Sequence, residues 1–153
     1  MLNRRSVLKS VSVLALTPSF VWSNDESPLI YLSPLQTGGE LSRCQAEIWF
    51  VTDGGDFCVV TAFDAWRAEA VAKGLTRAKV WMGDVGQWQS SNGKYKTLPS
   101  VETNVRVETD ATAHARVLNQ FGQKYSAEWG TWGPRFKRGL ADGSRVMIRY
   151  RPV

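Results

Sequence analysis

The sequence predicts an α+β protein built on an antiparallel β-barrel or sheet of about six or seven strands with two helices. Three observations support this. Short runs rich in β-branched and aromatic residues alternate with turns rich in Gly, Asn and Asp. Two such runs flank the segment Asp53-Gly54-Gly55-Asp56, which is a strong hairpin signal. Only two stretches carry a helical pattern, and both lie between strands, as in α+β folds.

The first 23 residues predict an export signal rather than part of the fold. The pair Arg4-Arg5, followed by Leu8-Lys9, resembles the twin-arginine export pattern, and a short apolar region follows it over residues 10–16. That region is too short and too often interrupted for a membrane span, which needs about 20 apolar residues. We expect cleavage after Ser23, and so a domain of residues 24–153 that is periplasmic or secreted and has no integral membrane anchor.

The charge of the predicted mature domain gives no support for a nucleic-acid partner. Removal of residues 1–23 takes away Arg4, Arg5 and Lys9, which leaves 16 basic against 14 acidic residues. The remaining net charge of about +2 is far below the basicity that nucleic-acid binding requires. A domain of this length still supports one good hydrophobic core.

The first half of the mature chain predicts strands over 29–33, 44–52, 57–63 and 78–83. A helix of about ten residues is expected over 65–73, because the segment is rich in alanine, follows Asp64 as an N-cap and ends before Gly74. Pro34 ends the first strand, and Thr37-Gly38-Gly39-Glu40 forms a turn.

The second half predicts a hairpin of strands 87–89 and 95–98, then strands 104–108 and 144–150. Asp110 is expected to cap a second helix. One apolar face of that helix is predicted from residues at steps of three or four: Ala111, Ala115, Leu118, Phe121, Tyr125 and Trp129. The glycine-rich segment 130–139 is expected to be an aromatic and basic loop.

The two cysteines are predicted to be free and buried, although an export signal makes a disulfide the usual expectation. If Asp53 faces Asp56 in the hairpin, Cys58 lies opposite Val51, and Cys44 lies seven residues further along the same strand. Seven residues span about 23 Å in a strand, whereas a disulfide requires Cα atoms within about 7 Å.

The order of the predicted elements, with a set of spaced residues, resembles the split β-barrel flavoproteins. This group includes the pyridoxamine-phosphate-oxidase-like proteins and the small deazaflavin-dependent nitroreductases. The residues that carry the resemblance are Thr37-Gly38-Gly39, Arg43, Glu47 to Val51, Val59-Val60-Thr61, Trp66 and the closing Ile148 to Pro152.

The resemblance implies a cofactor, either flavin mononucleotide or a deazaflavin, and an oxidoreductase-like activity. It also implies a homodimer with the cofactor site at the interface between the two subunits. The residues that we expect at the cofactor are Arg43, Thr61, Trp66, Arg67 and Lys79. Arginine and lysine suit an anionic tail, and tryptophan suits an aromatic ring. No catalytic acid or base is identified by this resemblance.

Two departures from the family pattern favour an alternative, which is a non-enzymatic module that binds a small ligand or a partner protein. The loop Gly38-Gly39-Glu40-Leu41-Ser42 lacks the basic residue usual in the deazaflavin family. Segment 61–64 runs directly into the helix, where the family often has a glycine pair.

Several other kinds of site have little support. One histidine and two widely spaced cysteines do not predict a metal site, and no Gly-x-Ser-x-Gly motif predicts a hydrolase. His114 is expected to be a helix-flank residue without a chemical role. A cluster of aromatic and basic side chains either clamps a ligand or only covers the end of the barrel: Trp129, Trp132, Arg135, Lys137 and Arg138.

Overall fold

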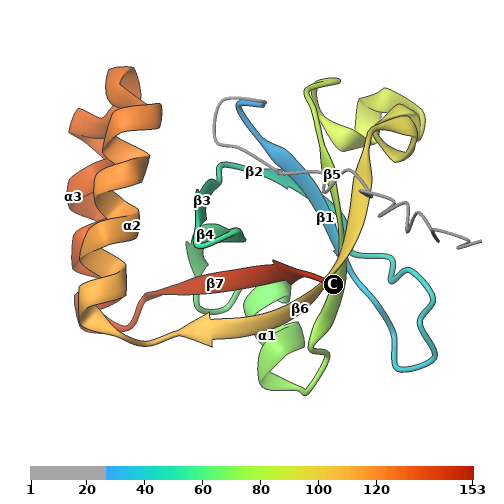
Figure 1. The fold of residues 1–153 in the computed structure, drawn as a ribbon, viewed down its shortest axis with the longest axis horizontal. Coiled ribbons are helices and arrows are strands. Elements are labelled where there is room, and N and C mark those ends of the chain that lie inside the picture. The colour runs from blue at the N-terminus through green and yellow to red at the C-terminus, as the bar shows by residue number, and fades with distance from the viewer. Residues whose placement is uncertain (1–26) are drawn as a thin grey trace, which may run out of the picture.

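The computed structural model describes residues 27–153, so the predicted export signal lies outside the described residues. Seven antiparallel strands form one sheet that curls into a half-barrel, which confirms the predicted α+β split-barrel class (Figure 1). The strands are β1 (Ile30–Pro34), β2 (Ala46–Ile48), β3 (Val51–Asp53), β4 (Asp56–Ala62), β5 (Arg77–Met82), β6 (Ser100–Glu108) and β7 (Arg145–Pro152). Their order in the sheet is β2-β1-β5-β6-β7-β4-β3.

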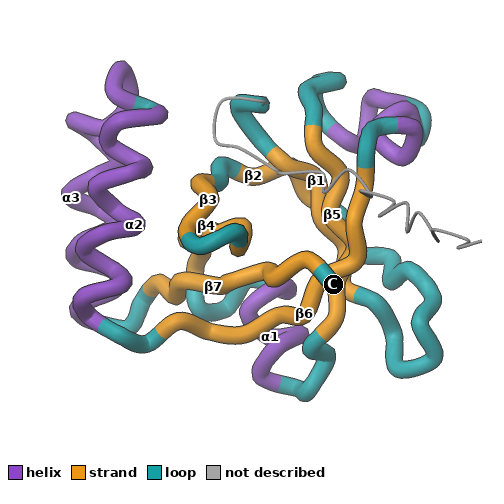
Figure 2. The backbone as a smooth tube through the Cα atoms, viewed as in Figure 1, coloured by secondary structure: helices purple, strands orange, loops and turns teal. Residues whose placement is uncertain are grey.

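Three α-helices, rather than the expected two, accompany the described part of the sheet. They are α1 (Trp66–Ala72), α2 (Ala111–Lys124) and α3 (Ser126–Asp142), and two short 3-10 helices are η1 (Trp88–Ser91) and η2 (Lys94–Thr97). Figure 2 shows α2 and α3 standing as a pair on one side of the curled sheet, while α1 lies beside β6 at the lower end of the half-barrel.

Two hydrophobic cores form on the two faces of β4. Its alternating residues Val59 and Cys58 belong to different cores, as strand geometry requires. Val59 lies in the barrel interior with Ile30, Ile148 and Ala68 of α1. Cys58 and Val60 face α2 and α3, and their core includes Val51, Val117, Phe121, Phe136 and Met147.

The predicted register of the hairpin is confirmed, but the strand that precedes it is interrupted. Val51 pairs with Cys58 and Asp53 with Asp56. The predicted strand over 44–52 is wrong because it breaks at Trp49 and Phe50 into β2 and β3. At the break, Phe50 N–H donates to the hydroxyl of Tyr125 at 3.0 Å, and this hydroxyl lies 2.9 Å from Phe50 O. A buried side chain therefore replaces the ladder partners that Phe50 loses.

The predicted hairpin over 87–98 is wrong. The Asn92-Gly93 pair turns the chain as expected, with φ of 50° and 77°, but it joins η1 to η2 instead of two strands. Tyr95 explains this outcome, because its ring packs edge-on against Trp81 at 5.3 Å and is buried on the outer face of the sheet.

The predicted loop over 130–139 is also wrong, because α3 runs through it with Pro134 inside the helix. Tertiary packing outweighs the low helix propensity of its glycines. A Cβ at Gly133 would lie 2.8 Å from ring atoms of Trp129, so only glycine admits the indole there. In α1, the expected cap Asp64 is replaced by Ala65, which makes no side-chain cap bond, whereas Asp110 caps α2 as predicted.

A buried ion-pair network ties the β3–β4 hairpin to β6, β7 and α2. Arg149 is 4% exposed and donates to Asp53 at 2.6 Å, to Glu108 at 2.9 Å and to Asp56 at 3.5 Å. Each of these carboxylates also pairs with a second arginine nearer the surface. The pairs are Asp53 with Arg116, Glu108 with Arg106 and Asp56 with Arg151. The carboxylates are thus compensated on both sides, as buried charges require.

Candidate functional site

A cavity of about 540 Å³ opens where β2, β4 and α1 meet α3, and its size is typical of small-molecule sites. Residues on or beside β2, β4, β7, α1 and α3 line it, so residues far apart in the chain converge there. The lining residues are Leu29, Glu47, Ile48, Trp49, Val60, Thr61, Ala62, Arg67, Trp132, Phe136 and Arg145.

Two residues that line this cavity each carry a buried polar atom with no hydrogen-bond partner within the described part of the chain. The two atoms are Oγ1 of Thr61 and Nε of Arg67. Folded proteins rarely leave such groups unpaired, because the loss of water then costs about 1–3 kcal/mol per group. A ligand with acceptor atoms would satisfy both groups once the two side chains turn toward the cavity.

The charge of the lining is positive. Arg67 and Arg145 contribute two guanidinium groups, and Glu47 contributes the single carboxylate. Burial lowers the pKa of Arg67, and the nearby Tyr150 hydroxyl partly opposes this shift. Arginine remains protonated even so, because its ordinary pKa is so high. The cavity therefore presents a partly desolvated cation, a favourable site for an anion.

Two tryptophans, together with Phe136, form the aromatic part of the lining. The rings of Trp49 and Trp132 meet edge to face with centroids 6.2 Å apart. Trp49 is held from behind by Tyr125, whose ring stacks on it at 4.3 Å with planes 7° apart. Trp132 lies beneath the guanidinium groups of Arg135 and Arg145, at 5.1 and 5.9 Å from its ring centre. These contacts fix both indoles before any ligand binds.

The structure brings together only part of the predicted cofactor site. Thr61 and Arg67 line the cavity, and Trp66 lies behind Arg67, whose guanidinium is 5.4 Å from the Trp66 ring centre. Trp66 itself packs against the barrel core rather than lining the cavity. Arg43 is exposed between β1 and β2, outside this lining.

Lys79 is separated from the cavity by the order of the sheet. It lies on β5, and β6 and β7 stand between β5 and β4. Its ammonium group lies 5.6 Å from the ring centre of Trp81, a residue of the aromatic cluster that also contains Tyr31 and Tyr95. The prediction chose Lys79 for its charge, without the strand order that separates it from Thr61.

Of the lining residues, Arg145 was not expected at a site, and Trp49 was not among the expected cofactor residues. Trp132 belonged to the cluster that was expected either to clamp a ligand or to cover the end of the barrel. Trp132 and Phe136 lie four residues apart in a segment that was expected to be a loop. This spacing, with Trp129, is a helical signal that the glycines and Pro134 obscured. Arg145 reaches the cavity because it pairs with Ala62 at the end of β4.

The described residues offer no evident metal centre. Within residues 27–153, no group of three or more His, Cys, Asp or Glu side chains is placed to hold a metal ion. None of the described helices is both long and apolar enough to cross a bilayer.

Comparison with solved structures places this fold among split-barrel proteins. Similar chains include HutZ, the heme storage protein of Vibrio cholerae, at TM-score 0.56 and 15% identity over 85% of this chain and 84% of that one. A Listeria innocua protein, named provisionally as a pyridoxamine 5′-phosphate oxidase, matches at TM-score 0.53 and 16% identity over 84% and 86%. General Stress Protein 26 of Bacillus anthracis matches at 0.52 and 16% over 82% and 80%.

These likenesses establish the fold alone, since the sequence identities are low and one fold supports many functions. No family model matches the sequence, and no match among curated proteins is found. The function must therefore be argued from the cavity of this chain.

Proposed function

We propose that this protein binds a flavin, either flavin mononucleotide or a deazaflavin, in the cavity lined by Thr61, Arg67 and Trp132. The observation that carries the proposal is the pair of buried, unpartnered donors, Thr61 Oγ1 and Arg67 Nε, on two residues that line one cavity. The named Listeria relative supports a flavin-type ligand at the level of the fold.

The lining suits the two halves of such a ligand. Arg67 and Arg145 would hold the anionic tail, because guanidinium groups bind phosphate through paired hydrogen bonds. Trp49 and Trp132 would pack against the ring system, and Thr61 would donate to one of its oxygens or to the phosphate.

Haem, the ligand in the name of the Vibrio relative, fits this cavity poorly. Haem iron is held by an axial His, Cys, Met or Tyr side chain. None of the described residues that line the cavity is of these types. The only histidine, His114, lines a different cavity.

A bound flavin would supply electron or hydride transfer, and the protein would contribute binding, orientation and exclusion of water. Glu47 is the single acidic side chain in the lining, and its Oε2 already accepts from Trp88 N at 3.1 Å. Glu47 is therefore the one possible general acid or base of the lining, and the redox chemistry itself would belong to the cofactor.

Titration of the purified protein with flavin mononucleotide, riboflavin and a deazaflavin would test the proposal through quenching of tryptophan fluorescence. We expect a micromolar dissociation constant for the phosphorylated ligands. Riboflavin should bind about tenfold more weakly, because it lacks the charge-assisted hydrogen bonds of the phosphate. Absence of quenching by all three ligands in the folded protein would refute the proposal.

Variants test whether binding occurs in this cavity. Arg67→Met should weaken binding of flavin mononucleotide about tenfold, and Thr61→Val by a smaller factor. Arg43→Met and Lys79→Met are matched controls, because both remove a charge outside the lining, and both should leave the affinity unchanged. Loss of affinity in these controls but not in Arg67→Met would place the ligand elsewhere.

The second candidate is a binding module without redox activity, which the departures in segments 38–42 and 61–64 favour. Anaerobic mixing of the flavin-loaded protein with NADPH distinguishes an oxidoreductase from a binding module. An oxidoreductase should speed reduction of the bound flavin over that of free flavin, whereas a binding module should not.

A further inference from the structure

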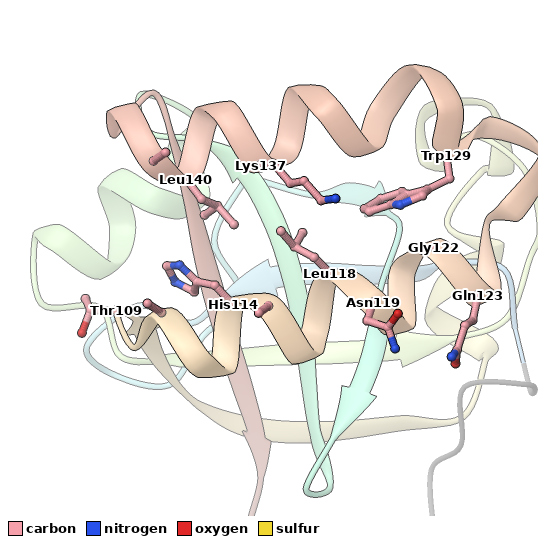
Figure 3. A pocket seen from close by; sticks show the side chains of 12 residues that line it. Thr109, His114, Leu118, Asn119, Gly122, Gln123, Trp129, Lys137 and Leu140 are labelled. Carbon is pink, nitrogen blue, oxygen red and sulfur yellow. The ribbon is translucent and has the colours of Figure 1, made fainter.

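A second cavity, of about 910 Å³, lies between α2 and α3 and is unrelated to the proposed flavin site. Figure 3 shows side chains of both helices pointing into it, with His114 and Leu118 coming from α2 and Trp129, Lys137 and Leu140 from α3. The two cavities use different faces of α3, since Trp132 and Phe136 line only the first one.

Small residues keep this groove open. Ala111, Ala115 and Gly122 line it from α2, whereas the buried face of α2 consists of other residues, including Val117 and Phe121. The predicted apolar face was therefore wrong in its first half, because Ala111 and Ala115 are exposed to the groove instead of packing on the sheet.

The floor of the groove is apolar. Leu118 and Leu140 form part of it, and the indole of Trp129 lies against Gly122. A Cβ at Gly122 would come within 2.8 Å of Nε1 of Trp129, so the glycine allows the ring to lie close along the helix. The result is an extended apolar surface that an aliphatic chain or a ring can cover.

The polar groups around this floor are cationic or neutral. Lys137 extends into the groove toward Trp129 in Figure 3, and no ion pair within residues 27–153 involves it. Asn119 and Gln123 add amide groups, and no carboxylate is among the described lining residues. Nε2 of His114 lies 2.6 Å from the carbonyl oxygen of Glu108 and so donates to it, which leaves Nδ1 for another partner.

We propose that this groove binds an amphipathic monocarboxylate, with its carboxylate at Lys137 and its apolar body along Leu118, Leu140 and Trp129. The absence of acidic side chains from the described lining disfavours a cationic ligand. A single lysine, without an arginine or a run of backbone N–H groups, suits one carboxylate better than a phosphate.

Isothermal titration calorimetry with decanoate, kept below its micelle concentration, tests the proposal. We expect a dissociation constant of about 0.1–1 mM, with decanol binding about tenfold more weakly because it lacks the charge. Lys137→Met should weaken binding of decanoate about tenfold and leave that of decanol unchanged, whereas the control Lys94→Met removes an exposed charge on η2 and should change neither.

A second variant tests the place of binding. Ala115→Trp fills the groove from an exposed helix position, so the protein should fold normally and lose decanoate binding. Arg67→Met changes the proposed flavin site and should leave decanoate binding intact, which keeps the two proposals separable. Wild-type failure to bind decanoate, or equal binding by Ala115→Trp or Lys137→Met, would overturn the assignment.

Discussion

Arg149 is a buried cation whose removal would leave Asp53 and Glu108 without their inner partner. We expect Arg149→Met to lower the free energy of unfolding by about 3–5 kcal/mol, because uncompensated buried charges are costly. Arg106→Met is the matched control, since the Arg106 side chain is half exposed and, among the described residues, has its one ion pair with Glu108, and it should cost less than about 1 kcal/mol. Urea unfolding at neutral pH measures the free energy of unfolding of both variants, and equal losses would contradict the buried role of Arg149.

The same network predicts how stability depends on pH. Hydrogen bonds from Arg116, with smaller contributions from Arg149, outweigh the opposing effect of burial and hold the pKa of Asp53 well below its usual range. The folded state therefore binds fewer protons than the unfolded state, so the free energy of unfolding should fall as the pH drops below about 4. Urea unfolding at a series of pH values measures this fall. Arg116→Met should make it shallower, and an unchanged slope would exclude Asp53 as its source.

The thiols of Cys44 and Cys58 are free in the structure, as predicted, but for a partly different reason. The hairpin register was correct, whereas Cys44 lies before β2 and not on the strand that carries Val51.

Burial raises the pKa of Cys58 to about 12, while Cys44 is only half-buried. Iodoacetamide should therefore modify Cys44 first and Cys58 only after denaturation, as mass spectrometry without reductant would show. A mass that corresponds to a Cys44–Cys58 disulfide would contradict the structure.

At the scale of single elements, α3 provides a test with its own internal control. A side chain at Gly133 would collide with the Trp129 ring, whereas a Cβ at Gly130 would meet nothing within 4 Å. We expect Gly133→Ala to destabilise the protein by about 1–3 kcal/mol through overpacking. Gly130→Ala should instead stabilise it by about 0.5–1 kcal/mol through helix propensity. Thermal unfolding followed by circular dichroism measures the melting temperature of both variants. Equal shifts of that temperature would show that Trp129 does not restrict position 133.

Elements with local signals were predictable from the sequence, and elements set by distant contacts were not. Asp110 and the hairpin turn at Asp53–Asp56 act through neighbours a few residues away, so both were predicted correctly. The break at Trp49–Phe50 depends on Tyr125, which lies 75 residues later in the chain. In the candidate site, Thr61 and Arg67 were predicted through a family resemblance. Arg145 was missed because the β4–β7 register brings it there, and the choice between the two roles offered for Trp132 depended on the position of α3.

At the scale of the whole molecule, we propose that the chain is exported in a folded state through the twin-arginine route. The proposal rests on Arg4-Arg5 and Leu8-Lys9. Replacement of both arginines by lysine should block export and leave uncleaved precursor in the cytoplasm, which cell fractionation and immunoblotting would detect. Normal export of this double variant would instead assign the protein to the general secretion route.

The ends of the sheet have a consequence for how molecules of this protein meet. β2 and β3 are the two edge strands, and each has only three residues. β3 also ends at Asp53, whose carboxylate is held in the Arg149 network. Edges this short offer a neighbouring chain few unpaired N–H and C=O groups, and such edges are one means by which natural sheets avoid joining edge to edge. The division of one predicted strand into two short ones thus leaves the sheet with edges of a kind that disfavours such pairing.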